Sequence, residues 1–274
     1  MKKLSLLLCL LLIHLNTLAQ GKLFIIGGGP RPANMINQMI DEADVRTNGY
    51  AVVLPMSSSN TEAAMASGKK QFVDNGIAAV TAFNFIKGDT PDPALLDSIR
   101  NAKLIYISGG SQGRFMNVVA GTAIEQAVWD CYQKGGTIAG TSAGAAVMSE
   151  KMITGAQVHY PDADGGFRVI EKGNTKLSQG LGLVKKAIID QHFVRRSRHN
   201  RLITLAIENP GLKCIGIDES TAIIVKGNKV KVIGLSQVLV FDGSKGRKRE
   251  KAKKISMKDL RLHIYLDGDT FSLN

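Results

Sequence analysis

A serine between two glycines is the residue of this chain best suited to nucleophilic chemistry. The segment Gly140–Gly144 reads Gly-Thr-Ser-Ala-Gly, with an apolar lead-in at 137–139 and a run of small residues after it. A G-x-S-x-G motif between a buried strand and a helix is typical of a nucleophile elbow. The turn would strain Ser142 at a helix N-terminus, where backbone N–H groups stabilise a developing oxyanion. The alternative is an ordinary tight turn in which Ser142 caps the helix.

A serine hydroxyl becomes a good nucleophile only when a positioned base takes its proton. Beyond the first 19 residues the histidines are His159, His192, His199 and His263. His192 directly follows the apolar strand 187–189, which predicts a position at a strand end. His199 and His263 fit structural roles in a helix and a strand, and His159 lies in a polar segment. His192 is therefore the candidate base.

The base in turn needs an acid that orients its second ring nitrogen. The apolar strand 213–217 is followed directly by two carboxylates, Asp218 and Glu219. Their spacing alone does not distinguish between them.

Arginines follow the candidate base at Arg195, Arg196, Arg198 and Arg201. Spacings of three would put Arg195, Arg198 and Arg201 on one side of a helix. The guanidinium group binds carboxylates through two parallel hydrogen bonds. A cluster beside a catalytic serine therefore predicts an acidic substrate, such as an aspartyl or glutamyl peptide. The alternative is a solvated helix face.

Apolar strands and amphipathic helices alternate through the first half of the chain. Strands are expected at 22–26, 51–54, 78–83, 104–107 and before Ser142, and helices at 33–43, 61–75, 92–100 and 122–134. This alternation predicts an α/β fold with a doubly wound, mostly parallel sheet. Ligands bind such sheets at the carboxyl ends of the strands.

Three glycine-containing loops would meet at that edge of the sheet: Gly27–Gly29, Gly109–Gly110 and Gly140–Gly144. The first is not G-x-G-x-x-G, and Pro30 and Pro32 after it have no N–H to offer a phosphate. Nucleotide binding is therefore not expected.

The last quarter of the chain has a different pattern. Segments 221–225 and 229–233 flank the turn signal Gly227-Asn228, and 237–241 and 261–266 alternate as antiparallel strands do. We expect a β-rich extension of one domain that covers residues 20–274. Residues 155–180 are interpreted as a polar surface excursion, and the basic run 245–254 as a solvated loop.

The first 19 residues have the pattern of a secretory signal peptide. Lys2 and Lys3 precede the apolar run 4–15, and small residues lead to a cleavage site near Ala19 and Gln20. Export to the periplasm or the extracellular space is expected, with no integral membrane segment after signal removal.

Composition narrows the class further. The 274 residues carry a formal net charge of +12, but the lysines are scattered and aromatic residues make up only 5%, so nucleic-acid binding is not expected. No His/Cys cluster has metal-ligand spacing, and neither a metal nor a cofactor is expected. Cys131 and Cys214 are interpreted as buried thiols, with one disulfide as the alternative.

With these motifs assembled, the chain resembles the cyanophycinase-type serine peptidases, whose relatives include aspartyl dipeptidases and whose fold is like that of class I glutamine amidotransferases. The resemblance spans residues 22–233. It rests on G-T-S-A-G-A from Gly140, G-G-S-Q from Gly109, D-Q-H-F-V-R-R-S-R-H-N-R-L from Asp190 and G-I-D-E-S-T-A from Gly216.

The resemblance implies a role for each matched residue. Ser142 would be the nucleophile, His192 the base and Glu219 the orienting acid, with the N–H groups of Gly110 and Ala143 as the oxyanion hole. A substrate-recognition set would comprise Gln112, Asp190, Gln191, Arg196, Arg198 and Arg201.

The implied activity is an exported exopeptidase that cleaves cyanophycin (multi-arginyl-poly-aspartate) to β-Asp-Arg dipeptides, or related isoaspartyl peptides. Two departures bear on the substrate. Ser111 stands where these enzymes are expected to have aspartate, and the loop from Gly27 to Pro32 lacks expected acids. The alternatives are an α-aspartyl dipeptidase and a non-catalytic carboxylate-binding homologue. A homodimer is a candidate assembly.

Overall fold

The computed structural model describes residues 20–163 and 166–274. The expected signal peptide, residues 1–19, lies outside the described residues. Within the described ranges, no helix has both the length and the apolar character needed to cross a bilayer.

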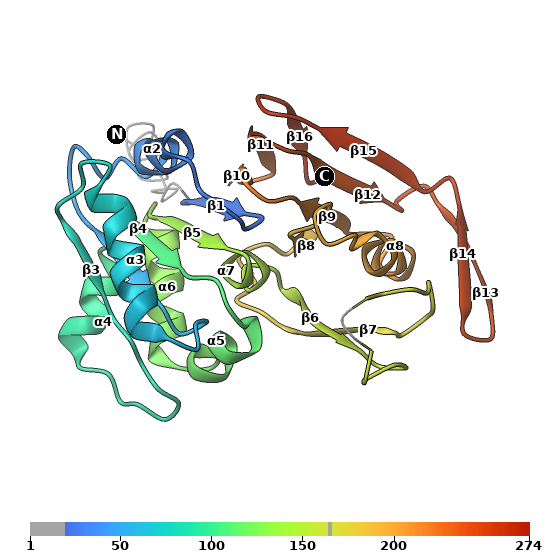
Figure 1. The fold of residues 1–274 in the computed structure, drawn as a ribbon, viewed down its shortest axis with the longest axis horizontal. Helices are drawn as coiled ribbons and strands as arrows, with labels where there is room; N and C mark the ends of the chain where they lie inside the picture. The colour runs from blue at the N-terminus through green and yellow to red at the C-terminus, as the bar shows by residue number, and fades with distance from the viewer. Residues whose placement is uncertain (1–19, 164–165) are drawn as a thin grey trace, which may run out of the picture.

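An eight-stranded sheet in the order β16-β11-β10-β1-β5-β4-β2-β3 forms the centre of the molecule (Figure 1). Its parallel strands β1, β5, β4, β2 and β3 are those expected from the sequence. They span Lys22–Ile26, Thr137–Thr141, Leu104–Ile107, Ala51–Leu54 and Val80–Ala82. Strands β10, β11 and β16 pair antiparallel beyond β1, at Thr221–Lys226, Lys229–Gly234 and Thr270–Ser272. The mostly parallel sheet and its β-rich C-terminal extension are thus confirmed.

Successive side chains of the parallel strands point to opposite faces, and each face packs on its own helices. Phe24 and Tyr106 belong to the cluster of α2 and α3, which span Ala33–Glu42 and Thr61–Val73. Ile25 and Ile107 belong to the larger cluster on the other face. The helices of that face are α4, α5, α6 and α7, at Pro93–Arg100, Gln112–Val119, Ala123–Gln133 and Ala143–Ala146. This is the doubly wound arrangement.

A second sheet lies beside the first, in the order β15-β12-β9-β8. Its strands span Arg261–Tyr265, Val238–Asp242, Lys213–Ile217 and Ala187–Gln191. Ile189 and Ile215 extend the large core cluster, whereas Ile188 and Cys214 point to helix α8, His199–Glu208. The parallel pair β8 and β9 therefore ends beside the carboxyl ends of β1 and β5 (Figure 1).

Three local expectations are wrong, and one helix was missed. Residues 155–180 are no simple excursion, because β6 (Lys151–Gln157) pairs with β7 (Thr175–Gln179). The basic run is no loop but an exposed hairpin, in which β13 (Arg247–Lys251) pairs with β14 (Lys254–Lys258). Helix α5 was not expected. Arg195 precedes α8 and Arg198 only caps it, so Arg195, Arg198 and Arg201 do not share a helical side.

Candidate active site

The turn at Ser142 is as tight as the G-x-S-x-G motif requires. Ser142 has φ 54° and ψ −108°, a region that residues with a side chain rarely occupy. A Cβ on Gly140 would lie 2.3 Å from the carbonyl oxygen of Gly144, and one on Gly144 would lie 2.3 Å from that of Ile107. Only glycines therefore allow β5, the turn and α7 to approach this closely. The positive φ of Ser142 costs about 1–3 kcal/mol.

The structure brings Ser142, His192 and Glu219 into one hydrogen-bonded chain. His192 Nε2 lies 2.9 Å from Ser142 Oγ, and His192 Nδ1 lies 2.6 Å from Glu219 Oε1. Asp218 is held elsewhere, because its carboxylate accepts hydrogen bonds from the Arg195 N–H at 2.9 Å and the Ser236 hydroxyl at 2.8 Å. The choice that spacing left open thus has a geometric answer: Glu219 is the carboxylate bonded to the imidazole.

A single loop after β1 supports all three groups. The carbonyl oxygens of residues 26, 27 and 28 accept hydrogen bonds from the amides of Ser142, His192 and Ser220 at 3.0, 2.7 and 2.9 Å. These three residues all have positive φ, of 54°, 47° and 53°. A Cβ on Gly28 would lie 2.3 Å from the imidazole, and one on Gly29 would lie 2.7 Å from Glu219 Cβ. This role of the loop was missed, although its run of glycines was the available signal.

Gly110 and Ala143 belong to two chain segments that meet at the nucleophile. A Cβ on neighbouring Gly109 would contact Ser142 Cβ at 3.5 Å, so the loop after β4 runs past the serine. Gly110 has φ 137°, and a Cβ there would meet the Ser57 carbonyl at 2.2 Å. Neither the Gly110 nor the Ala143 amide has a hydrogen-bond acceptor among the described residues. Both are thus free to donate, and their role as an oxyanion hole stays a prediction.

The expected recognition residues differ in what they contact. Asp190 and Arg201 are buried and form an ion pair, with Arg201 Nε donating to Asp190 Oδ2 at 2.6 Å. Asp190 Oδ1 also accepts from the Gln191 amide, and Arg198 donates to the Gln191 carbonyl at 2.6 Å and side chain at 2.8 Å. These contacts fix the residue before His192.

Two further members of that set lie at different places. Gln112 begins α5 and donates from Nε2 to the Ile153 carbonyl at 2.8 Å. Arg196 is exposed, and its guanidinium has no partner among the described residues. Arg196 is the exposed cation whose charge acts on the His192 imidazole, which suits it to an anionic ligand beside the base.

Burial and two cations keep the candidate base neutral. Burial lowers the pKa of His192 below its ordinary value, the bond to Glu219 opposes this, and the charges of Arg196 and Arg198 lower it further. Burial likewise lowers the pKa of Arg198, to about 10, where the side chain is still charged at neutral pH. A neutral imidazole whose Nδ1–H is held by a carboxylate leaves Nε2 ready to accept a proton.

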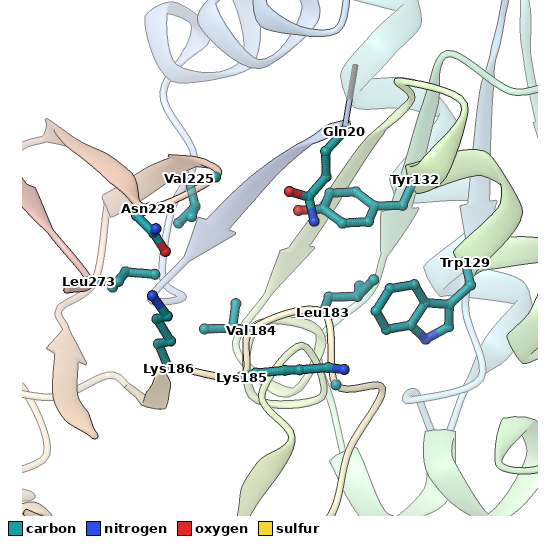
Figure 2. A pocket seen from close by; sticks show the side chains of 12 residues that line it. Gln20, Trp129, Tyr132, Leu183, Val184, Lys185, Lys186, Val225, Asn228 and Leu273 are labelled. Atoms are coloured by element: carbon teal, nitrogen blue, oxygen red, sulfur yellow. The ribbon is translucent and has the colours of Figure 1, made fainter. Parts of the chain in front are cut away.

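Two features bear on what else the described residues could bind. In the ranges that the structure describes, no group of three or more His, Cys, Asp or Glu side chains is arranged to hold a metal ion. A pocket of about 350 Å³ lies at the amino end of β1, lined by Gln20, Trp129, Tyr132 and Lys185 among others (Figure 2). Ser142 lies at the opposite end of the sheet, so this pocket is separate from the candidate active site.

A doubly wound fold with a strained serine, a neutral histidine and an orienting glutamate at its strand ends defines a serine hydrolase. The model of peptidase family S51 matches residues 23–233, and the chain belongs to that family. It is a serine peptidase.

Named relatives agree with this assignment, and a solved structure shares the fold. Cyanophycinase of Nostoc sp. is 28% identical over 237 residues, covering 83% of this chain and 76% of that protein. Cyanophycinase of Geminocystis herdmanii is 31% identical over 194 residues, covering 68% of each chain. The crystal structure of a peptidase from an acI-B1 Actinobacterium superposes with a TM-score of 0.70 at 21% identity, covering 95% of this chain and 100% of that one. The last likeness concerns the fold.

Replacement of Gly29 by alanine tests how closely the loop positions the acid. Gly29 and Gly121 share φ 70°, but a Cβ at Gly29 meets Glu219 whereas one at Gly121 has open space around it. In both variants we expect the alanine at positive φ to lower the free energy of unfolding by about 1–3 kcal/mol. We expect only Gly29→Ala to lower kcat, by about 100-fold, because the carboxylate must shift. Equal kcat values for the two variants, measured beside urea unfolding, would show that the contact is unimportant.

Replacement of Arg196 by glutamine tests the electrostatic control of His192. Catalysis needs the neutral imidazole, so kcat/KM falls as pH drops through a pKa that lies below 6.5. Loss of the Arg196 charge raises this pKa, and the acidic limb of the pH profile moves to higher pH. The profile is measured with a neutral ester, which isolates acylation from carboxylate binding. Arg195→Gln, an exposed neighbour, is the control, and an equal shift in both variants would contradict the assignment.

Proposed function

We propose that this chain is a serine exopeptidase that hydrolyses aspartyl peptide bonds, releasing β-Asp-Arg dipeptides from cyanophycin or cleaving related isoaspartyl peptides. The observation that carries the proposal is the chain of hydrogen bonds from Glu219 through His192 to Ser142, at 2.6 and 2.9 Å. The relatives named cyanophycinase support the substrate class. An α-aspartyl dipeptidase is the alternative, because the same cations would bind either linkage.

Acylation begins when Ser142 Oγ attacks the scissile carbonyl carbon and its proton passes to His192 Nε2. Glu219 holds the Nδ1–H of the ring and stabilises the imidazolium that forms. The carbonyl oxygen becomes an oxyanion, and the N–H groups of Gly110 and Ala143 donate to it. The carbon–nitrogen bond then breaks as His192 returns the proton to the leaving amine, which leaves an ester on Ser142.

Deacylation repeats these steps with water as the nucleophile. His192 removes a proton from water, the resulting hydroxide attacks the ester carbonyl, and the oxyanion occupies the same site. Collapse expels Ser142 Oγ, which takes its proton back from His192. The acidic product leaves as a free carboxylic acid and the resting site is restored.

Substrate recognition follows from which cations are free. Arg196 is exposed beside the base and is proposed to bind a substrate carboxylate. Gln112, Gln191 and Arg198 already make hydrogen bonds within the protein. The buried Asp190–Arg201 pair contributes by positioning Gln191 and His192.

Export is part of the proposal, on the sequence pattern of residues 1–19 alone. The N-terminal sequence of protein recovered from outside the cytoplasm would begin near Gln20 if the signal peptide is removed as that pattern predicts.

Replacement of Glu219 by glutamine tests the orienting acid. The amide cannot stabilise the imidazolium and can reverse the ring tautomer, so we expect kcat to fall by about 10² to 10⁴. The matched control is Asp218→Asn, which removes the neighbouring carboxylate that bonds Arg195 and Ser236. We expect that variant to lose stability while kcat stays close to that of the wild type. A loss in Asp218→Asn as large as in Glu219→Gln would assign the acid wrongly.

Product analysis by mass spectrometry tests the substrate. Wild-type protein and Ser142→Ala are incubated with cyanophycin, β-Asp-Arg and α-aspartyl dipeptides. We expect the wild type to release β-Asp-Arg from the polymer or aspartate from an isoaspartyl peptide, and Ser142→Ala to release neither. Cleavage of the α-aspartyl dipeptides alone would favour the alternative, and equal products from both proteins would exclude Ser142 as the nucleophile.

A further inference from the structure

A second cavity, of about 460 Å³, opens directly on Ser142. Its walls are the loop after β1 with Arg31, the first turns of α3 with the residues before it, and the ends of β4 and β5. It therefore lies on the α2/α3 face of the sheet. None of the arginines that follow His192 lines it.

Arg31 is the charged side chain of this cavity. Its Nε donates to Gln71 Oε1 at 2.9 Å, and its guanidinium carbon lies 5.9 Å from the centre of the Tyr106 ring. These contacts fix the orientation of the guanidinium. The two contacts use one N–H and one face of the guanidinium. The Nη atoms of Arg31 have no hydrogen-bond partner among the described residues. No Asp or Glu is among the described residues that line the cavity.

Two hydroxyls of the same cavity are buried without a hydrogen-bond partner. Ser108 is 7% exposed and Thr141 is 5% exposed, and neither side-chain oxygen is paired within the described residues. Ser108 follows Tyr106 by two residues and Thr141 follows Ala139 by two, so both point to the α2/α3 face. The nearby Ser58 hydroxyl, by contrast, donates to the Asn60 carbonyl at 2.8 Å.

Unpaired buried polar groups are rare in folded proteins and often mark a place that a ligand completes. An oriented guanidinium with free N–H groups and two hydroxyl donors matches the oxygens of a carboxylate. The cavity is contiguous with Ser142, so that carboxylate would belong to the peptide being cleaved.

We propose that Arg31, Ser108 and Thr141 form a carboxylate-binding subsite beside Ser142. This inference rests on the proposed function and deepens it, because it names a specificity determinant outside the arginine segment. An acidic dipeptide offers two suitable groups, the free carboxylate of its aspartyl residue and the C-terminal carboxylate of its leaving residue. A cationic side chain would meet Arg31 with no acid to receive it, so the subsite selects anionic over arginyl groups and, of the two substrates proposed above, favours isoaspartyl peptides over cyanophycin.

The test measures binding by calorimetry in Ser142→Ala protein, with Arg31→Met added. Three probes are used: β-aspartyl-alanine, its C-terminal amide, and β-alanyl-alanine, which lacks the aspartyl carboxylate. Arg31→Met is expected to weaken β-aspartyl-alanine binding about 10- to 100-fold, the usual range for a charge-assisted hydrogen bond. Arg31→Lys, which keeps the positive charge but not the paired N–H donors of the guanidinium, should lose less affinity. Arg46→Met, an exposed arginine paired with Asp41, should lose nothing.

The probes distinguish the two sources of the carboxylate. If Arg31 binds the aspartyl carboxylate, β-alanyl-alanine is insensitive to Arg31→Met. If it binds the C-terminal carboxylate, the amide is the insensitive probe. An equal loss of affinity for all three probes, or no loss for any, overturns the proposed subsite. Circular dichroism of Arg31→Met, together with the result for Arg31→Lys, distinguishes misfolding from lost binding. Because binding needs no turnover, failure of the proposed peptidase reaction would appear separately, as absent cleavage by the wild type.

Discussion

Three consecutive carbonyl groups at the end of β1 hold the candidate active site together. The carbonyls of residues 26, 27 and 28 accept hydrogen bonds from the amides of Ser142, His192 and Ser220, which follow β5, β8 and β9. Two sheets meet at this loop, and each strained residue receives one backbone bond from it. A backbone hydrogen bond in a buried site contributes about 1 kcal/mol and costs more when lost. The loop therefore compensates for the positive φ angles that aim the nucleophile and the base at each other.

Charge is divided between two sides of the nucleophile. On one side, burial lowers the pKa of His192, Arg196 and Arg198 lower it further and Glu219 opposes them, so the ring is neutral at rest yet stabilised when it takes a proton. On the other side, Arg31 lies over Tyr106 with no acid nearby in the cavity. A peptide with carboxylates on both sides of its scissile bond would complement both regions. The buried Asp190–Arg201 pair keeps the segment between them in place without itself meeting solvent.

The sequence predicted the structure best at positions where only one local conformation explains the residue types present. G-x-S-x-G predicted the elbow, the apolar runs predicted the parallel strands, and His192 could be placed at a strand end. The choice between Asp218 and Glu219 could not be made, because it depends on the twist of the chain after β9 and on Ser236, a residue distant in sequence. Arg195, Arg198 and Arg201 were misplaced because helical spacing was assumed across a segment that turns at Ser197, which has φ 50°. The pairing of β6 with β7 was hidden by polar side chains typical of loops.

The two cysteines give the fold a chemical property of its own. Cys131 lies on α6 in the large core cluster and Cys214 on β9 in the cluster of α8, both as free thiols. Burial raises the pKa of Cys131 to about 12 and raises that of Cys214 as well, so neither forms the reactive thiolate in the native state. A thiol-directed reagent would therefore label these positions only in molecules whose cores have opened. Opening of the core would also destroy the geometry that activates Ser142. A serine-directed reagent would therefore label only folded molecules, and a thiol-directed reagent only unfolded ones.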